Sequence, residues 1–483
     1  VPIVKHSYLL KHAHQIPYAV CEGIYIAKNG RPGPVVIDIP KDVGTEKLDI
    51  NLLRQVTIRD VLKRRPHFRF KTVIDPEKIQ YFFNLTHLSL RPLFYVGGGV
   101  VLSDSYNEFQ EMLRIFNIPV TTTLMGKGAI ADEHPLNLGM LGMHGTAPAN
   151  FAVSQCDLLI ALGARFDDRV TGKIDRFAPN AVIIHIDIDP AEFSKNKRIH
   201  LPITGNLKTI FQYMLQTYLT DPMLVNGNRR HKWHKRIRDW KERYPLIVPE
   251  LGNKLSAQYV IKNLSDNFPD AVFTTDVGQH QMWCAQFLQL KPRHWCSSAG
   301  LGTMGYGLPA AIGAQVDDRD KTVICVSGDA SVQMNIQEFG TLAQYKIPVI
   351  LIIVNNGWQG MVRQWQQQFY EERYSHSNMQ NGAPNFVALS ASYGLEGIDV
   401  TTPDELLTVL ETVKERKKNK NYNPLIVNCV VVEDDNCYPM VKPGQANTLM
   451  DGVDNMPKEI EDQEKDALEK EQLEAEERKR KKF

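Results

Sequence analysis

Several features that mark particular classes of protein are absent from this sequence of 483 residues. Its seven cysteines form no CxxC pair, so we assign them no metal-binding or redox role and interpret them as inert thiols of a reducing compartment. A formal net charge of +1 argues against a nucleic-acid surface. No stretch of about 18 uncharged apolar residues occurs, so no membrane span is predicted.

The beginning of the sequence carries neither a secretory signal nor an Arg/Ser-rich transit peptide. Residue 1 is valine, and an amphipathic helical pattern is followed directly by a strand pattern over residues 33–40. We therefore expect the sequence to begin inside a domain whose earlier part is absent.

The remaining composition is that of a soluble globular protein, with 43% hydrophobic and 23% charged residues. Strand and helix patterns alternate along the chain, which predicts successive three-layer α/β domains with mainly parallel sheets. The expected parts are the remnant of a first domain (1–50), a linker without clear periodicity (51–72), a central α/β domain (73–220), a linker helix (221–254), a third domain (255–440), and a charged extension, disordered or helical (441–483).

The most informative stretch lies between Val323 and Val362. A short apolar strand pattern ends at Gly328-Asp329, a helix pattern over 332–345 follows, and a second strand pattern ends at Asn355-Asn356. Because the carboxyl ends of parallel strands meet at one edge of a sheet, Asp329 and Asn356 are expected to lie together. A carboxylate and an amide oxygen are ligands that suit Mg²⁺ beside a diphosphate. An ordinary βαβ unit is the alternative.

Other turns at expected strand ends are rich in glycine and charge. Three glycines at 97–99 lack a full dinucleotide spacing and are interpreted as a tight turn. The segments GMHG, GARFDDRVTG and the strand ending at Asp187 suit a ligand with phosphates, a ribose and a flat ring, such as a flavin or adenine nucleotide. Surface salt bridges are the alternative for the RFDDR cluster.

In the third domain, a turn carries Gln279 and His280, and a segment of small residues begins after Met304. Small residues permit close approach of the backbone to a ligand or to another helix. Further on, Met361, Trp365 and Phe369 share one face of an expected helix directly after the Asn355-Asn356 turn. Either a core stripe or the mouth of a site fits this pattern.

These motifs together resemble one family. The segments GDAS, MGYGLPAAIG, MLGMHG, GARFDDRVTG, RPGPVVIDIPKDV and CYPMV, with the paired Asn, are similar to those of acetohydroxyacid synthase catalytic subunits, also called acetolactate synthases, of the plant, algal and cyanobacterial type. The similarity covers about residues 1–447. It implies the thiamine diphosphate-enzyme fold and a transferase that decarboxylates pyruvate and joins the two-carbon unit to pyruvate or 2-oxobutanoate in branched-chain amino acid synthesis.

The resemblance also implies cofactors. Thiamine diphosphate, Mg²⁺ and a non-redox FAD are expected. The metal ligands would be Asp329, Asn356 and the backbone carbonyl of Trp358. The cofactor-binding residues would be Arg31, His144, Gly145, Arg165, Asp187, Asp189 and Asn206 for FAD, and Gln279, His280, Gly328, Ala330, Ser331 and Gln359 for thiamine diphosphate.

Roles in the reaction follow from the same resemblance. Met304 would support the bent cofactor, Arg169 would bind the carboxylate of the second oxoacid, and Trp365 would shape its pocket. The substrate channel would add Lys41, Met143, Asp168, Met361 and Phe369. A homodimer or homotetramer, a small regulatory subunit, and a plastid location, or the cytoplasm in a prokaryote, are implied as well.

One departure from the family bears on activity. The glutamate that activates the cofactor belongs to the first domain, and neither Glu22 nor Glu46 has the required setting in the sequence. Two alternatives to the carboligase therefore stay open: a related oxidase or decarboxylase that uses thiamine diphosphate and FAD, and a non-catalytic fragment or assembly subunit.

Overall fold

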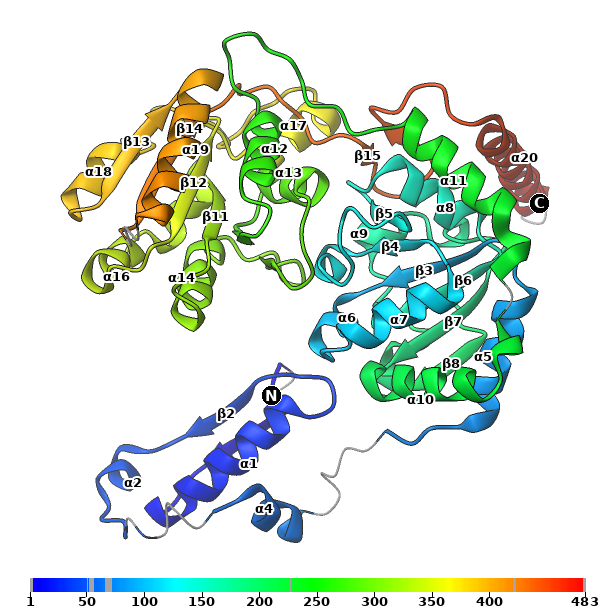
Figure 1. The fold of residues 1–483 in the computed structure, drawn as a ribbon, viewed down its shortest axis with the longest axis horizontal. Coiled ribbons are helices and arrows are strands. Elements are labelled where there is room, and N and C mark those ends of the chain that lie inside the picture. The colour runs from blue at the N-terminus through cyan, green and yellow to red at the C-terminus, as the bar shows by residue number, and fades with distance from the viewer. Residues whose placement is uncertain are drawn as a thin grey trace.

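The computed structural model describes residues 3–49, 51, 56–65, 72–225, 227–419 and 423–480; of residues 227, 228 and 471–480 it describes only the backbone. Two large parallel sheets, each covered by helices on both faces, form the central and C-terminal domains, and a smaller unit at the N-terminus lies apart from both sheets (Figure 1). The expected three-layer α/β architecture with parallel sheets is confirmed.

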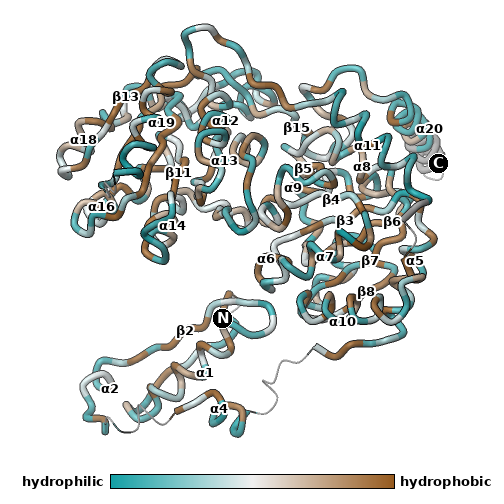
Figure 2. The backbone as a smooth tube through the Cα atoms, viewed as in Figure 1, coloured by the Kyte–Doolittle hydropathy of each residue, from teal (hydrophilic) through white to brown (hydrophobic). Residues whose placement is uncertain are grey.

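The central sheet has the strand order β5-β4-β3-β6-β7-β8, and all its strands are parallel. In β3, Phe94 and Val96 enter the core on one face while Leu93 and Tyr95 enter the core on the other. A strand buried on both faces favours apolar residues at successive positions, as in the LLIAL segment of β6, and Figure 2 shows the hydropathy along the chain. Its strands are β3 (Pro92–Val96), β4 (Val120–Thr122), β5 (Asn137–Met140), β6 (Leu158–Leu162), β7 (Val182–Asp187) and β8 (Leu201–Thr204).

Helices fill both faces of this sheet. They are α5 (Pro76–Leu88), α6 (Gly98–Leu102), α7 (Tyr106–Phe116), α8 (Ala147–Gln155), α9 (Asp168–Thr171), α10 (Leu207–Thr220) and α11 (His231–Arg243). The last buries Trp233, Ile237 and Trp240, as its helical spacing predicts. At the triple glycine the backbone passes close to the backbone of Gly163, because a Cβ at Gly97 would lie 2.1 Å from the carbonyl oxygen of Gly163.

The C-terminal sheet is also parallel, with the order β10-β9-β11-β12-β14-β13. Its strands are β9 (Val272–Thr275), β10 (Trp295–Ser297), β11 (Val323–Gly328), β12 (Ile350–Asn355), β13 (Glu396–Val400) and β14 (Leu425–Val430). Its helices are α12 (Ala257–Asn267), α13 (Gln279–Phe287), α14 (Gly307–Asp317), α15 (Asp329–Val332), α16 (Glu338–Tyr345), α17 (Gly360–Phe369), α18 (Phe386–Ser392) and α19 (Pro403–Lys418). The single helix expected over 332–345 is instead divided into α15, a 3-10 turn and α16.

The N-terminal unit contains one strand more than the sequence pattern indicates. Strand β1 (His6–Leu9) pairs in parallel with β2 (Val35–Asp38), and α1 (Ile16–Lys28) connects them. Helix α2 (Lys41–Thr45) follows β2. Within the expected linker, α4 (Ile58–Arg64) forms because Thr57 and Asp60 cap it reciprocally and Val61 is fully buried. Residues 52–55 and 66–71 of that segment lie outside the described residues.

A buried ion pair of the central domain is hydrogen-bonded to the backbone of the C-terminal domain. The ammonium of Lys127 donates to Asp132 Oδ2 at 2.7 Å and to the carbonyl oxygen of Leu288 at 3.3 Å, and Leu290 N donates to the same carboxylate oxygen at 2.9 Å. Lys127 is buried, so two oxygen acceptors, one from each domain, take the place of water around its charge.

The C-terminal extension returns to the central domain. A short antiparallel pair, β15 (Met440–Val441) and β16 (Met450–Asp451), leads to α20 (Lys458–Arg480) beside α11 and α8 (Figure 1). Ile460 is fully buried in the central core, and Glu464 accepts a hydrogen bond from Arg176 at 2.6 Å. The extension was expected to be disordered or helical; it contains the helix α20, which packs on the central domain through Ile460. In the described part of the chain, no helix is long and apolar enough to cross a membrane.

Candidate active site

The carboxyl ends of β9 and β11 flank the topological switch point of the C-terminal sheet, where the strand order reverses. The chain leaves β9 toward β10 on one side, whereas β11 continues to β12 on the other. Crevices of this kind are where parallel α/β sheets bind ligands. The residues after these strands, 276–280 and 328–331, therefore meet at the predicted edge.

His280 lies between two glycines at this edge. A Cβ at Gly328 would be 3.0 Å from His280 Nδ1, and a Cβ at Gly278 would be 2.9 Å from His280 Cε1. Burial lowers the pKa of His280 to about 4, so the ring is neutral at pH 7. Its Nε2 has no hydrogen-bond partner among the described residues, which leaves one buried ring nitrogen for a ligand.

Asp329 opens α15 and is almost fully buried. Its Oδ1 accepts a hydrogen bond from Ala330 N at 2.9 Å, but Oδ2 has no partner among the residues described. Burial raises the pKa of Asp329 to about 6, and the nearby backbone N–H groups of Ala330, Gly357 and Trp358 offset only part of that effect. A cation at Oδ2 would satisfy this atom and compensate the buried charge.

The turn after β12 lies beside this carboxylate. Asn355 Oδ1 accepts from Gly357 N at 3.2 Å, and Asn356 Oδ1 accepts from Trp358 N at 3.1 Å. Asn355 thereby braces the turn. Asp329 and the Asn356 turn are thus brought together as the βαβ spacing predicts.

Gln279 fixes the other side of the turn. Its Nε2 donates to Gln364 Oε1 at 2.9 Å and to the carbonyl oxygen of Asp435 at 3.0 Å, while its Oε1 accepts from Asn356 Nδ2 at 3.5 Å. Gly360 leaves the necessary room, since a Cβ there would lie 2.0 Å from Gln279 Oε1. The side-chain nitrogen of Asn356 therefore donates to Gln279, and its side-chain oxygen accepts from the backbone of Trp358.

The remaining residues predicted for this edge have structural partners. Ser331 Oγ accepts from Gly328 N at 3.0 Å, and Gln359 N donates to the carbonyl oxygen of Ser377 at 2.8 Å. Within the described chain, no group of three or more His, Cys, Asp or Glu side chains could hold a metal ion. The magnesium hypothesis therefore depends on one carboxylate, one amide and a backbone carbonyl, a donor set that suits Mg²⁺ with diphosphate oxygens.

Asp276 is a site residue that the sequence interpretation missed. It is buried at the end of β9, and its carboxylate accepts from Gly305 N at 2.8 Å and from Gly307 N at 3.2 Å. These bonds hold the loop that carries the half-buried Met304 next to the Gly278 turn. The sequence signal for Asp276 was a carboxylate directly after a buried strand. The sequence interpretation selected only Gln279 and His280 from that turn.

A second cluster combines residues from both large domains. Arg169 of α9 lies over the Trp365 ring of α17, with 5.8 Å from the guanidinium carbon to the ring centre, and Arg169 Nη1 is 4.0 Å from Met143 Sδ. Trp365 also packs against Phe369, with ring centres 5.2 Å apart. A small pocket of about 80 Å³ adjoins Met143, Asp168 and Arg169. The structure thus unites most of the predicted substrate residues.

Two of the predicted channel residues are placed differently. Met361 packs against the core of the C-terminal domain, near the start of α17. Lys41 begins α2 in the N-terminal unit, far from α9 and α17 (Figure 1). Within one chain, Lys41 therefore does not join the cluster of Arg169 and Trp365.

The predicted FAD residues follow the carboxyl edge of the central sheet. Arg165 pairs with Asp167 at 3.0 Å after β6, Asp187 ends β7, and Asn206 caps α10 after β8. Arg31 reaches from the N-terminal unit to this edge, where its Nη1 donates to Asp189 Oδ2 at 3.0 Å and also to Glu192.

His144 stands at the junction of the two large domains. Its carbonyl oxygen accepts from Gln286 Nε2 at 3.1 Å, and its buried Nδ1 has no partner among the described residues. Burial lowers the pKa of His144 to about 4. A Cβ at Gly145 would lie 2.6 Å from the Leu141 backbone, so this position serves a tight turn.

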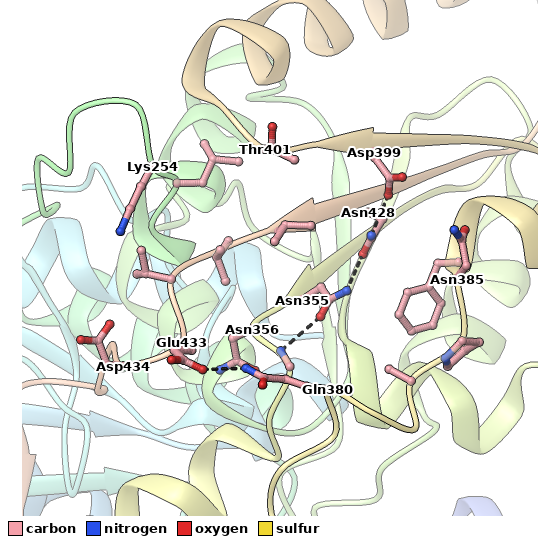
Figure 3. A pocket seen from close by; sticks show the side chains of 18 residues that line it. Lys254, Asn355, Asn356, Gln380, Asn385, Asp399, Thr401, Asn428, Glu433 and Asp434 are labelled. Carbon is pink, nitrogen blue, oxygen red and sulfur yellow. Dashed lines mark hydrogen bonds between the residues drawn. The ribbon is translucent and has the colours of Figure 1, made fainter.

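A larger pocket of about 930 Å³ lies on the far side of the Asn355-Asn356 turn (Figure 3). Asn428 and Asp399 line it from β14 and β13, and Glu433 accepts from Trp358 Nε1 at 2.9 Å. The sequence interpretation did not select these three residues. Only the sheet order brings β13 and β14 next to β12, and no local pattern reveals that order.

Comparison with known proteins agrees with this geometry. The family described as thiamine pyrophosphate enzyme, C-terminal TPP binding domain, matches residues 276–429, and the corresponding central-domain family matches residues 84–214. The chain is 49% identical over 462 residues to the acetolactate synthase large subunit of Cyanidium caldarium, which covers 95% of this chain and 77% of the relative. It is 49% identical over 458 residues to that of Porphyra purpurea (94% and 75%) and 46% identical over 457 residues to that of Parasynechococcus marenigrum (95% and 72%).

Proposed function

The chain belongs to the acetolactate synthase large-subunit family of thiamine diphosphate enzymes, and from this premise we propose how its residues serve the reaction. The carboligase prediction is confirmed at the level of the family. Thiamine diphosphate binding and the transferase activity follow from that membership, whereas the metal, the flavin and the residue roles are inferences from the geometry.

We infer that Mg²⁺ binds at the edge formed by Asp329 and the Asn356 turn. The single observation that carries this inference is the buried Asp329 Oδ2, which has no partner among the described atoms. Asn356 Oδ1 and the carbonyl oxygen of Trp358 would complete the protein ligands. Gly328, Ala330 and Ser331 would border the diphosphate at the start of α15, and His280 Nε2 would contribute one further hydrogen bond.

When bound, thiamine diphosphate supplies an electron sink for the decarboxylation of a 2-oxoacid. The protein supplies position and charge. Asp276 holds the loop of Met304, so that this side chain can support the cofactor from one side. Neutral His280 donates or accepts one hydrogen bond without adding a charge to the buried edge.

Substrate selection is assigned to the cluster around Arg169. Its guanidinium would bind the carboxylate of the second oxoacid, pyruvate or 2-oxobutanoate, because this group is exposed beside a small pocket. Trp365 would limit the length of the acyl chain. Met143, Asp168 and Phe369 would form the approach, and Lys41 would reach such a site only from a second copy of the chain.

We further propose FAD at the carboxyl edge of the central sheet. The switch point of that sheet lies between β3 and β6, and the surrounding groups suit the ligand chemically. Arg31 and Arg165 would face phosphates, Asp187 and Asp189 would face ribose or ribityl hydroxyls, and Asn206, His144 with its orphaned Nδ1, and Gly145 would border the rest. A homodimer or homotetramer with a small regulatory subunit, in a plastid or in prokaryotic cytoplasm, is the proposed setting.

The decisive test measures acetolactate formation from pyruvate with thiamine diphosphate, Mg²⁺ and FAD, for the chain and for Asp329→Ala. Turnover that disappears in the variant, together with a loss of Mn²⁺ binding measured by electron paramagnetic resonance, supports the assignment. Undiminished Mn²⁺ binding by Asp329→Ala would contradict the metal site.

A further inference from the structure

A line of side-chain hydrogen bonds crosses three strands behind the Asn355-Asn356 turn (Figure 3). Asp399 of β13 accepts from Asn428 Nδ2 at 2.8 Å, and Asn428 Oδ1 of β14 accepts from Asn355 Nδ2 at 3.1 Å. Asn355 Oδ1 in turn accepts from Gly357 N at 3.2 Å. The line therefore runs from the edge of the sheet to the backbone of the turn.

The strand register explains this alignment. Asp399 pairs with Asn428, and Asn428 pairs with Ile353, two residues before Asn355. On this face of the sheet, Ile353 and Ile426 belong to the apolar core. Asn355 and Asp399 are the last residues of this row in β12 and β13, and in β14 only the exposed Val430 follows Asn428 on the same face.

The line has a fixed direction. A carboxylate at Asp399 only accepts hydrogen bonds, so Asn428 has to present its NH₂ group there and its carbonyl oxygen to Asn355. Asn355 then has to present its own NH₂ group, which turns its Oδ1 toward Gly357 N. One exposed carboxylate thereby sets the orientation of two amides.

The atoms at the end of the line belong to the proposed metal site. Gly357 lies between Asn356 and Trp358, and its N–H group lies near the Asp329 carboxylate. Asn428 is only 6% exposed, so an apolar replacement would leave Asn355 Nδ2 without its partner in a nearly dry setting. Neither Asn428 nor Asp399 is a proposed metal ligand.

We propose that Asn428, oriented by Asp399, is a positioning residue for the magnesium turn. It holds Asn355, and through Asn355 it sets the backbone at Gly357, so that Asn356 Oδ1 and the Trp358 carbonyl oxygen face the metal. This inference deepens the proposed function and rests on the magnesium site at Asp329.

Metal affinity tests the proposal independently of turnover. The dissociation constant of Mn²⁺ is measured by electron paramagnetic resonance in the presence of thiamine diphosphate, well below the melting temperature of each variant. We expect Asn428→Leu and Asp399→Leu to weaken Mn²⁺ binding by up to about tenfold, the lower end of the effect seen when a direct outer partner of a metal ligand is lost, because both residues reach the ligands only through Asn355. Asp399→Asn keeps an acceptor oxygen and is expected to bind Mn²⁺ like the wild type.

A matched control separates positioning from stability. Ser390 of α18 is buried and donates to the carbonyl oxygen of Phe386 at 2.7 Å, outside the line. Ser390→Ala is expected to lower the melting temperature while leaving Mn²⁺ affinity unchanged. Asp399→Leu changes an exposed residue, so it still tests the proposal if Asn428→Leu fails to fold.

The outcomes are distinguishable. Unchanged Mn²⁺ affinity in Asn428→Leu or Asp399→Leu, or an equal weakening in Ser390→Ala, would overturn the positioning role while Asp329→Ala still abolishes binding. Wild-type affinity in Asp329→Ala would overturn the metal site and this inference together.

Discussion

The guanidinium of Arg169 and the ring of Trp365 join the central domain to the C-terminal domain, with 5.8 Å from the guanidinium carbon to the ring centre. The two residues are 196 positions apart in the sequence. A planar cation stacked on an indole keeps its edge free for a carboxylate. The proposed oxoacid site therefore takes residues from both domains.

Replacement of Arg169 by lysine should impair catalysis although the charge is kept. Lysine cannot combine stacking on Trp365 with a two-point contact to a carboxylate, so we expect kcat/KM for pyruvate to fall at least about tenfold, or about 1.4 kcal/mol. Steady-state kinetics of acetolactate formation checks this. Arg243→Lys is the control, because Arg243 lies over the Tyr244 ring at 5.4 Å, away from the site. Equal losses in both variants would contradict the assignment.

A methyl group at Gly360 should disrupt the metal edge. The Cβ would lie 2.0 Å from Gln279 Oε1 and 2.9 Å from Asn356 Nδ2, so both amides have to move. We expect Gly360→Ala to weaken Mg²⁺-dependent binding of thiamine diphosphate by about tenfold, the size of effect typical when partners of a metal ligand are lost. Isothermal titration calorimetry provides the measurement.

Gly313→Ala is the matched control for that substitution. Gly313 lies in α14, and a Cβ there meets nothing within 4 Å. Alanine should stabilise this helix by about 0.5–1 kcal/mol and leave cofactor affinity unchanged. If both alanine variants bound the cofactor like the wild type, the role given to Gln279 and Asn356 would be wrong.

Protonation of His144 should destabilise the fold at mildly acidic pH. Burial lowers the pKa of His144 to about 4, below its ordinary value of 6.5, so the folded protein favours the neutral ring. The corresponding stability is present above pH 6.5 and is lost as the pH falls toward 4. Between pH 7 and pH 5, this residue alone should reduce the free energy of unfolding by about 2 kcal/mol.

Urea denaturation of the wild type and His144→Gln at both pH values checks this expectation. The difference between the pH 7 and pH 5 values should be smaller in the variant, because glutamine does not titrate. His280 has a similarly lowered pKa and contributes the same pH dependence of stability in both proteins. Identical pH dependence in the two proteins would contradict the burial of a neutral His144.

Loss of Glu464 should destabilise the central domain. Its carboxylate pairs with Arg176 at 2.6 Å, and both side chains are largely buried. Glu464→Ala removes the hydrogen bonds that this carboxylate accepts from Arg176 and Thr448, which should cost about 1–3 kcal/mol. Leu468→Ala is the control, since Leu468 is 51% exposed on the same helix and should change stability by less than about 0.5 kcal/mol. Thermal unfolding of both variants measures these losses of stability, and equal losses in the two would contradict the role of Glu464.

Much of this arrangement follows from local sequence. A short segment that is apolar over 323–326 and ends abruptly in Gly328-Asp329 is typical of a buried parallel strand with its polar residues at the edge of the sheet. The spacing from Asp329 to Asn356 then places both at one edge, as found. The resemblance to acetolactate synthases selected Arg169 and Trp365, which no local pattern joins.

Other features depend on tertiary packing and were not predicted. The role of Asn428 requires β14 to insert between β12 and β13, an order that no segment encodes by itself. Strand β1 is short and only partly buried, so its pattern resembled a helix. The docking of α20 depends on Ile460 and Glu464 within an otherwise charged segment, where composition alone indicates solvent exposure.

That docking also affects the order in which the protein can fold as it is synthesised. Ile460, Val441 and Met450 belong to the same core as Leu93 and Tyr95 of β3. The ribosome has therefore made the whole C-terminal domain before the residues that complete the central core emerge. A chaperone that shields this open core during translation would have to remain bound until α20 arrives.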